Sequence, residues 1–170
     1  MSGLRVRAAE PRDYAHVARI TQAAYMAAGH FPEGHPYLRV LGDVAHRAEH
    51  AIVWLGESAG RPVAAVTLAE SGQPYSEVAR EGEIEFRMLA VDPAAQGAGV
   101  GRAMVHRILE DARSRPGIEA VVLTSASHMA SAHRLYGSLG FRRLPDRDWS
   151  FEGTGEKNLW VFRKDLDPAG

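Results

Sequence analysis

The sequence contains no cysteine, and this absence excludes several kinds of chemistry. Without thiols the chain forms no disulfide, builds no zinc site from thiolates and offers no cysteine nucleophile. A chain without disulfides suits a reducing compartment, so we expect the protein to be cytoplasmic.

An excess of charge of one sign is also missing. The chain has 20 Lys and Arg against 21 Asp and Glu, a formal net charge of −1, which does not suit a dedicated nucleic-acid binder. Apolar runs stay well short of the ~20 residues that a membrane span needs. The first residues, MSGLRVRAAEPRDY, lack the apolar region of a secretory signal. We therefore expect one domain over residues 1–170, which binds neither nucleic acid nor membrane.

Strand and helix patterns alternate along the chain. Apolar residues recur as in strands at residues 4–7, 52–55, 63–68, 83–91, 120–124, from 141 onward and at 159–162. Helical spacing follows residues 11–13 and recurs at 37–50, 100–113 and 129–139. The polar stretch 57–61, followed by Pro62, predicts a hairpin. Helices separate some strands and short turns join others, so the pattern predicts a mixed α/β fold with a mixed sheet.

Glycines concentrate at one turn, Gln96-Gly97-Ala98-Gly99-Val100-Gly101, which follows a predicted strand and opens a predicted helix. Glycine lets the backbone approach a ligand closely, and amides at a helix N-terminus attract anions. The turn therefore indicates a bound phosphate or pyrophosphate, although tight helix–strand packing would use the same residues. The dinucleotide pattern G-x-G-x-x-G fails, because Arg102 or Met104 would have to be glycine. A Walker Gly-Lys-Ser/Thr is also absent from the sequence.

Two motifs resemble signatures of the GCN5-related N-acetyltransferase (GNAT) superfamily. Gln96-x-x-Gly99-x-Gly101, preceded by Leu89-Ala90-Val91-Asp92-Pro93, is similar to its acetyl-CoA signature. Ala132-x-x-Leu135-Tyr136-x-x-Leu139-Gly140-Phe141 is similar to its second signature, in the family's order. With the elements around them, the resemblance covers most of residues 4–165. It implies the α/β GNAT fold, a mixed and mostly antiparallel central sheet of six to seven strands flanked by about four helices.

The resemblance implies acetyl-CoA as co-substrate and no metal. The backbone of Leu89, Ala90 and Val91 would pair with pantetheine as a further strand, which in this family splays from the strand of Leu123. The turn would hold the pyrophosphate, so the remaining implied cofactor residues are Gln96, Gly97, Ala98, Gly99, Val100, Gly101 and Arg102. Arg102 could equally be a solvated charge. His46 and His50 stand four residues apart, a spacing that suits metal ligands but fits a solvated helix face better.

Acetyl transfer to an amine needs a neutral nucleophile, an oriented thioester and a proton for the departing thiolate. With no cysteine available, direct attack within a ternary complex is the expected route. Tyr136 is the candidate general acid, because a phenol with a pKa of about 10 stays protonated at neutral pH. A tyrosine that merely packs beside Ala132 and Leu139 is the alternative.

Glu85 is the candidate base, acting directly or through water. Strand alternation places it on the same face as Leu89. A carboxylate that pairs with Arg87 or is simply exposed would explain Glu85 equally well, and Glu83 on the same face is the fallback. The family often has Asn seven residues before its tyrosine, where this chain has Met129, and the group that replaces it is open.

The expected function is that of an acyl-CoA-dependent N-acetyltransferase that acetylates a primary amine. A small-molecule amine is favoured, because the chain shows no obvious peptide-docking extension. The alternatives are a protein N-terminal or lysine acetyltransferase, or a non-catalytic acyl-CoA-binding or sensing domain. His30 and His35 lie in the loop that lines the acceptor site in this family, although a plain loop is as good a reading. Residues 142–149 suit an acceptor pocket, a dimer contact or a turn of internal ion pairs, and a homodimer is a further state that the fold allows.

Overall fold

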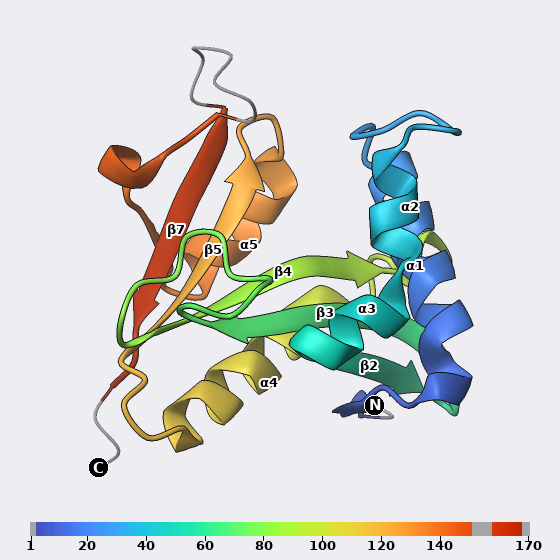
Figure 1. Cartoon of the computed structure of the whole chain (residues 1–170), viewed down its shortest axis with the longest axis horizontal. Coiled ribbons are helices and arrows are strands. Elements are labelled where there is room, and N and C mark those ends of the chain that lie inside the picture. Colours follow the sequence, from blue (N-terminus) through green and yellow to red (C-terminus); the bar gives the residue numbers. More distant parts are fainter. Residues whose placement is uncertain (1–2, 151–157, 168–170) are drawn as a thin grey trace. The chain divides into compact units, whose positions relative to one another are not determined.

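The computed structural model describes residues 3–150 and 158–167, which form a mixed α/β fold (Figure 1). The strands are β1 (Arg5–Ala8), β2 (Ile52–Ser58), β3 (Arg61–Glu70), β4 (Glu83–Val91), β5 (Ala120–Ala126), β6 (Arg142–Arg143) and β7 (Leu159–Asp165). The helices are α1 (Tyr14–Ala27), α2 (Tyr37–Gly42), α3 (Val44–His50), α4 (Val100–Ser114) and α5 (Ala130–Ser138). Single 3-10 turns cover Pro11–Asp13, Pro93–Ala95 and Pro145–Arg147.

The strands form one seven-stranded sheet in the order β1-β2-β3-β4-β5-β7-β6. β1 with β2, β2 with β3, β5 with β7 and β6 with β7 are antiparallel, whereas β4 and β5 are parallel. The predicted mixed, mostly antiparallel sheet is therefore confirmed. The predicted hairpin is confirmed as well, because Ala59 and Gly60 have φ of 52° and 76°, the two positive values that a tight hairpin turn requires.

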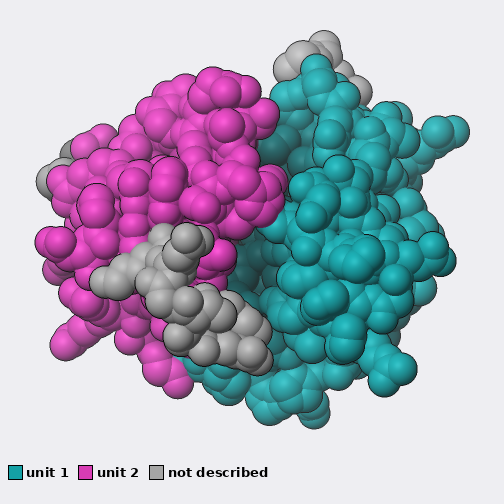
Figure 2. Space-filling view, turned by 90° about the horizontal axis from the view of Figure 1, so that it is seen from above, with its two compact units in different colours: residues 1–69, 73–75, 87–108 teal, residues 70–72, 76–86, 109–170 magenta. Residues whose placement is uncertain are grey.

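The chain divides into two compact units, which Figure 2 colours separately. Unit 1 comprises Met1–Ala69, Gln73–Tyr75 and Arg87–Ile108, and unit 2 comprises Glu70–Gly72, Ser76–Phe86 and Leu109–Gly170. β4 and α4 each contribute residues to both units. The single domain expected over residues 1–170 stays a prediction.

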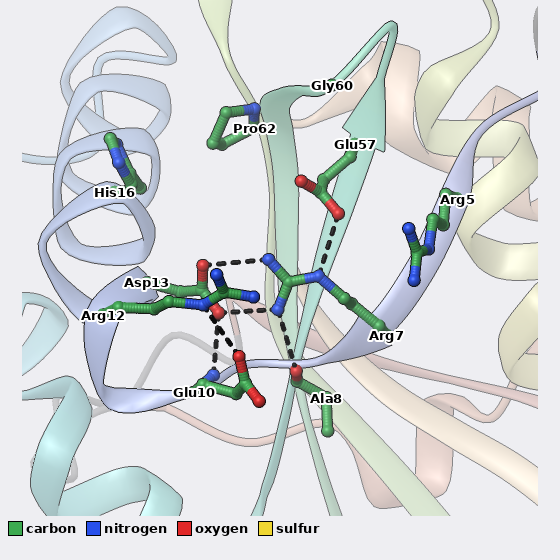
Figure 3. A pocket seen from close by; sticks show the side chains of 10 residues that line it. All are labelled: Arg5, Arg7, Ala8, Glu10, Arg12, Asp13, His16, Glu57, Gly60 and Pro62. Carbon is green, nitrogen blue, oxygen red and sulfur yellow. Dashed lines mark hydrogen bonds and ion pairs between the residues drawn. The ribbon is translucent and has the colours of Figure 1, made fainter.

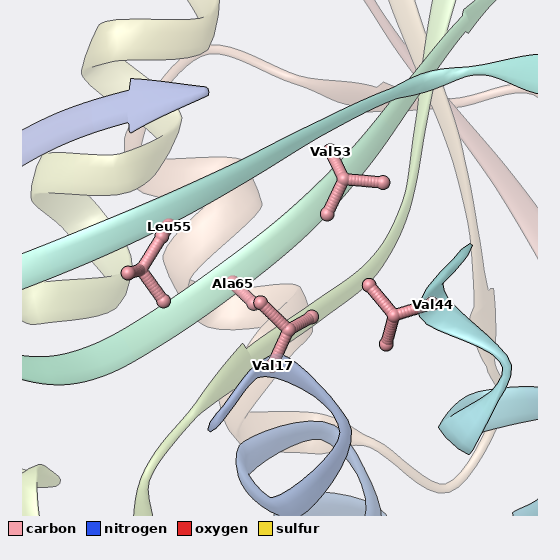
Figure 4. Close-up of a cluster of buried hydrophobic side chains, with 5 residues drawn as sticks. All are labelled: Val17, Val44, Val53, Leu55 and Ala65. Carbon is pink, nitrogen blue, oxygen red and sulfur yellow. The ribbon is translucent and has the colours of Figure 1, made fainter. Parts of the chain in front are cut away.

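In unit 1, α1 and α3 supply apolar side chains to a buried cluster with β2 and β3. The cluster contains Val17, Val44, Val53, Leu55 and Ala65 (Figure 4). Burying each of the larger aliphatic side chains contributes roughly 2 kcal/mol. The cluster therefore anchors both helices on the strands.

The single helix expected over residues 37–50 is wrong, because the structure has two helices, α2 and α3, in its place. Asp43 separates them with ψ of 65°, outside the helical range, and its side chain accepts a hydrogen bond from the His46 amide at 3.3 Å. An Asp in this position caps the following helix and so competes with continuation of the preceding one. Gly42 ends α2 against Gln22, whose Nε2 would lie 2.7 Å from an added Cβ.

Unit 2 contains the first part of β4 together with β5, β7 and β6. β7 lies between β5 and β6, with Leu123 opposite Phe162 and Arg143 opposite Phe162 on its other side. α5 ends as predicted, with Gly140 just after it at φ of 92°. The left-handed backbone at this position favours glycine.

Candidate functional site

The glycine turn lies in unit 1 at the start of α4. Gly97 and Gly99 have φ of 87° and 79°, in the left-handed region that favours glycine. A Cβ added to either residue would meet no heavy atom within 4 Å, so the space beside the turn is open. Gly101 lies in the first turn of α4 itself.

Most amides of this turn make no backbone hydrogen bond within the described residues. The amide of Ala103 bonds to the Gly99 carbonyl at 3.0 Å, the first backbone bond of the helix. In the part of the chain that the structure describes, the preceding amides of residues 97–101 donate to no backbone carbonyl. Open space, unused donors and the positive end of a 15-residue helix together fit a pyrophosphate.

The predicted pantetheine-binding residues Leu89, Ala90 and Val91 lie in the second part of β4, also in unit 1. The parallel register of β4 with β5 runs from Glu83 to Glu85, so these three residues follow it by at least four positions. The chain stays in contact with β3 beyond them, since the Asp92 amide donates to the Val63 carbonyl at 2.8 Å.

Met88 breaks the regular extension of β4. It is buried and has φ of 56°, which costs a residue with a side chain roughly 1–2 kcal/mol. Strand alternation therefore does not run unbroken from Glu85 to Leu89, and the inference that placed both on one face loses its basis. Nothing in the sequence signals this conformation, because methionine has no preference for positive φ.

Tyr136 lies in unit 2, on α5, within a ring of phenylalanines. The centroids of Phe86, Phe141 and Phe162 each lie 5.9 Å from that of Tyr136. The tyrosine is 8% exposed, and burial raises the pKa of its hydroxyl to about 12. Among the described residues this hydroxyl has no hydrogen-bond partner. The phenol is thus protonated at neutral pH and available to donate.

Glu85 is fully buried in unit 2 and holds the segment before β4. Its Oε1 accepts bonds from the amides of Glu77, Val78 and Ala79 at 2.9, 2.9 and 3.1 Å, and from Ser76 Oγ at 3.3 Å. Its Oε2 is buried without a hydrogen-bond partner. The carboxylate is therefore neither exposed nor held by an arginine, and one of its oxygens remains uncommitted.

The two predicted catalytic side chains lie on opposite faces of β4 in unit 2. Tyr136 packs against Phe86, whereas Glu85 bonds to residues 76–79. Successive side chains of a strand point to opposite faces, so Phe86 and Glu85 mark the two sides. The ten predicted cofactor residues all belong to unit 1.

Glu83, the fallback base, is committed to ion pairs in unit 2. Arg147 donates to both of its oxygens at 2.8 and 2.9 Å, and Arg163 donates to Oε2 at 2.8 Å. Burial would raise the pKa of Glu83, but the bonds from Arg147, the Arg80 amide and Arg163 outweigh it and lower that pKa. Arg143 pairs with Asp148 in the same way. Residues 142–149 therefore form intramolecular ion pairs, which is one of the three interpretations given above for this segment.

The two histidines whose spacing suits metal ligands contact other side chains within unit 1. His46 bonds through Nδ1 to the Tyr75 hydroxyl at 2.5 Å, and its ring packs on His50. Across residues 3–150 and 158–167, no group of three or more acidic or histidine side chains could hold a metal ion. No helix in the described ranges has the length and apolarity to cross a bilayer.

A polar pocket in unit 1 contains none of the predicted site residues (Figure 3). Charged side chains that line it pair with one another: Arg7 bonds to Asp13 at 2.6 and 2.9 Å and to Glu57 at 2.8 Å. The pocket is lined by Arg5, Arg7, Ala8, Glu10, Arg12, Asp13, His16, Glu57, Gly60 and Pro62.

Several curated proteins are similar to this chain. It is 34% identical over 103 residues to a chloroplastic serotonin N-acetyltransferase 2 of Oryza sativa subsp. japonica, covering 58% of this chain and 46% of that protein. It is 33% identical over 87 residues to N-alpha-acetyltransferase RimI of Mycobacterium tuberculosis, covering 51% and 52%. It is 35% identical over 77 residues to N-acetylaspartate synthetase of Danio rerio, covering 45% and 27%. The chain thus spans about half or less of the length of these relatives.

Solved structures share the fold. The ribosomal-protein-S18-alanine N-acetyltransferase of Escherichia coli superposes with a TM-score of 0.71 at 21% identity, covering 98% of this chain and 96% of that one. The PaiA N-acetyltransferase of Thermoplasma acidophilum, solved with coenzyme A, gives 0.72 at 12% identity, covering 96% and 99%. The model of the acetyltransferase (GNAT) family matches residues 15–141. The chain therefore belongs to the acetyltransferase (GNAT) family.

Proposed function

We propose that this protein transfers an acetyl group from acetyl-CoA to a primary amine, by direct attack of the amine on the thioester in a ternary complex. The observation that carries the proposal is the open glycine turn at the start of α4, where the amides of residues 97–101 donate to no backbone carbonyl of the described chain. Membership of the GNAT family supports it. Relatives named as N-acetyltransferases of serotonin and of N-alpha amines support an amine as acceptor.

Acetyl-CoA, when bound, supplies the thioester whose carbonyl carbon the amine attacks. The amides of residues 97–101 would hold its pyrophosphate, and Gln96 and Arg102 flank them. The backbone of residues 89–91, which follows the end of the β4–β5 register, would pair with the pantetheine arm. Glycine at 97 and 99 keeps side chains out of the phosphate position.

Tyr136 would donate its proton to the departing thiolate. Its hydroxyl keeps that proton at neutral pH, because burial raises its pKa to about 12. The surrounding phenylalanines pack against the ring and restrict its position, which orients the hydroxyl.

Glu85 would accept the amine proton, through its uncommitted Oε2 and a relaying water. Full burial makes direct contact with an acceptor less suitable than a relay. Glu83 is the poorer candidate, because two arginines already occupy its oxygens. A small-molecule amine is the favoured acceptor, and the similarity to RimI makes a peptide N-terminus the second candidate.

Thiol release from acetyl-CoA with a panel of small amines, lysine and peptide N-termini tests the proposal. We expect turnover with at least one amine, and we expect Tyr136→Phe to lower kcat by about tenfold or more with little change in acetyl-CoA affinity. Tyr14→Phe is the control, since this tyrosine packs against the Val17 cluster instead. Binding of acetyl-CoA without thiol release for any amine would instead identify a non-catalytic acyl-CoA sensor.

A further inference from the structure

Unit 1 contains a buried guanidinium that the proposed transfer reaction does not use. Arg47 of α3 is 1% exposed. Its Nη1 donates to the carbonyls of Val40 and Leu41 at 2.9 and 2.8 Å, at the end of α2. Its Nε is buried without a hydrogen-bond partner. The helix end offsets part of the charge, and one donor remains unused.

Arg47 has no carboxylate partner within the described ranges. Buried charges are ordinarily paired with an opposite charge, because burial removes their hydration. Burial accordingly lowers the pKa of Arg47, and the groups that oppose this shift are the phenols of Tyr75, Tyr25 and Tyr37. The local field around Arg47 is therefore positive, and among the described residues only the carbonyls at the end of α2 are seen to accept its hydrogen bonds.

These three tyrosines, which we call the phenol cluster, come from separate segments of unit 1. Tyr25 belongs to α1, Tyr37 to α2 and Tyr75 to residues 73–75, and each is partly exposed. Arg87 links two of them, donating to the Tyr37 hydroxyl at 3.4 Å and the Tyr75 carbonyl at 3.2 Å. The phenol cluster thus combines surface access with a buried positive charge beneath it.

The loop between α1 and α2 adds ring surface to the phenol cluster. Phe31 stacks on Tyr25 with an interplanar angle of 5° and lies 4.9 Å from Tyr37 between centroids. His35 lies 4.6 Å from Phe31. His30 and His35, the candidate acceptor contacts, lie in the same loop, so they and the phenol cluster occupy one region of unit 1.

We propose that the phenol cluster binds a carboxylate of the acceptor, so that the substrate is a small amine that also carries an acid group. This inference rests on the proposed acetyltransferase function and specifies its substrate class. The hydroxyls would donate hydrogen bonds to the carboxylate oxygens, and Arg47 would act through its field, which a low-dielectric interior strengthens. The same field opposes a second ammonium group and so disfavours polyamines.

Matched acceptors test the inference in the thiol-release assay. The series from glycine to 6-aminohexanoate varies the spacing between amine and acid, and each member is compared with its carboxamide. Spermidine represents the polyamines. We expect kcat/KM for the best carboxylate to exceed that of its carboxamide by about tenfold or more, since a site built for a charged group rejects its neutral analogue.

Variants test whether the preference for a carboxylate over its carboxamide depends on the phenol cluster. Tyr75→Phe and Tyr37→Phe remove one hydroxyl each and should reduce the carboxylate-to-carboxamide ratio of kcat/KM. Arg47→Met should bring the ratio close to one. Arg47 also caps α2, so Arg47→Lys, which retains the charge, should preserve much of the ratio if Arg47→Met fails to fold. Tyr14→Phe is the control for loss of a phenol from α1.

The outcomes separate the two proposals. Thiol release that favours carboxamides or spermidine overturns the acid-binding inference and leaves the acetyltransferase function intact. An unchanged ratio in both tyrosine variants also overturns it. Absence of thiol release with every amine, while acetyl-CoA still binds, overturns the proposed function and the inference with it.

Discussion

At the scale of single residues, the two oxygens of Glu85 differ in their hydrogen bonds. Oε1 accepts three backbone amides and one hydroxyl and so holds residues 76–79 in place. Oε2 is buried and has no partner. A purely structural carboxylate would have no reason to leave a buried oxygen unsatisfied, because an unpaired buried acceptor is costly. The uncommitted oxygen is what makes Glu85 the better base candidate.

Glu85→Gln tests the proposed role of Glu85 as the base. The amide oxygen of Gln can still accept the bonds to residues 76–79, but the side chain no longer takes up a proton. We expect kcat to fall about tenfold or more and the acidic limb of the pH–rate profile to disappear, while the fold is retained. Glu81→Gln is the control, since Glu81 is exposed just before β4. Retention of the acidic limb in Glu85→Gln would reject Glu85 as the titrating base.

Residue roles differ in how far the sequence could predict them. Tyr136 was identifiable from its motif, and the structure adds the buried ring that keeps it protonated. The burial of Arg47 was not identifiable, because this residue stands in a polar helix sequence, HRAEH, that fits a solvated face. Its guanidinium bonds to the carbonyls of Val40 and Leu41 at the end of another helix. Contacts of this kind leave no local pattern.

At the scale of elements, the glycine turn and β4 both require positive φ, but only the turn has glycine at those positions. The turn takes positive φ at Gly97 and Gly99, where the sequence provides glycine. β4 takes positive φ at Met88, where the sequence provides no glycine, so the neighbouring structure must hold that residue in place. The elements were predictable from apolar periodicity. The break at Asp43 and the kink at Met88 were not, because a capping contact and backbone strain override that pattern.

Gly99→Ala separates cofactor binding from backbone strain. A methyl group there has open space around it, so the cost to stability is that of a left-handed alanine, about 1 kcal/mol. We expect acetyl-CoA affinity to fall about tenfold, because the methyl occupies the approach to the amides. Gly60→Ala is the matched control: φ there is 76°, its surroundings are equally open, and it lies in the hairpin. Equal acetyl-CoA affinity in the two variants would contradict the proposed pyrophosphate position.

At the scale of the whole molecule, stability depends on carboxylates that are paired in both units. In unit 2, two arginines hold Glu83. In unit 1, Arg7 donates two bonds to Asp13 at 2.6 and 2.9 Å, and the Glu10 amide adds a third at 2.8 Å. The bonds from Arg7 lower the pKa of Asp13 from 3.8 to about 2. The response to acid therefore includes the protonation of these paired carboxylates.

Asp13→Asn should therefore change stability in a pH-dependent way. Because the folded pKa of Asp13 is depressed, its contribution is present above the unfolded value of 3.8 and is lost as pH falls towards about 2. We expect the variant to be about 1 kcal/mol less stable than the parent at pH 6, a value reduced because Arg7 remains partly exposed to solvent. Urea unfolding at a series of pH values measures this difference, which should shrink towards zero at the acid end. Glu33→Gln, at an exposed loop residue, is the control and should match the parent throughout. A difference between Asp13→Asn and the parent that stays constant with pH would show that the side chain stabilises the fold by packing and not by charge.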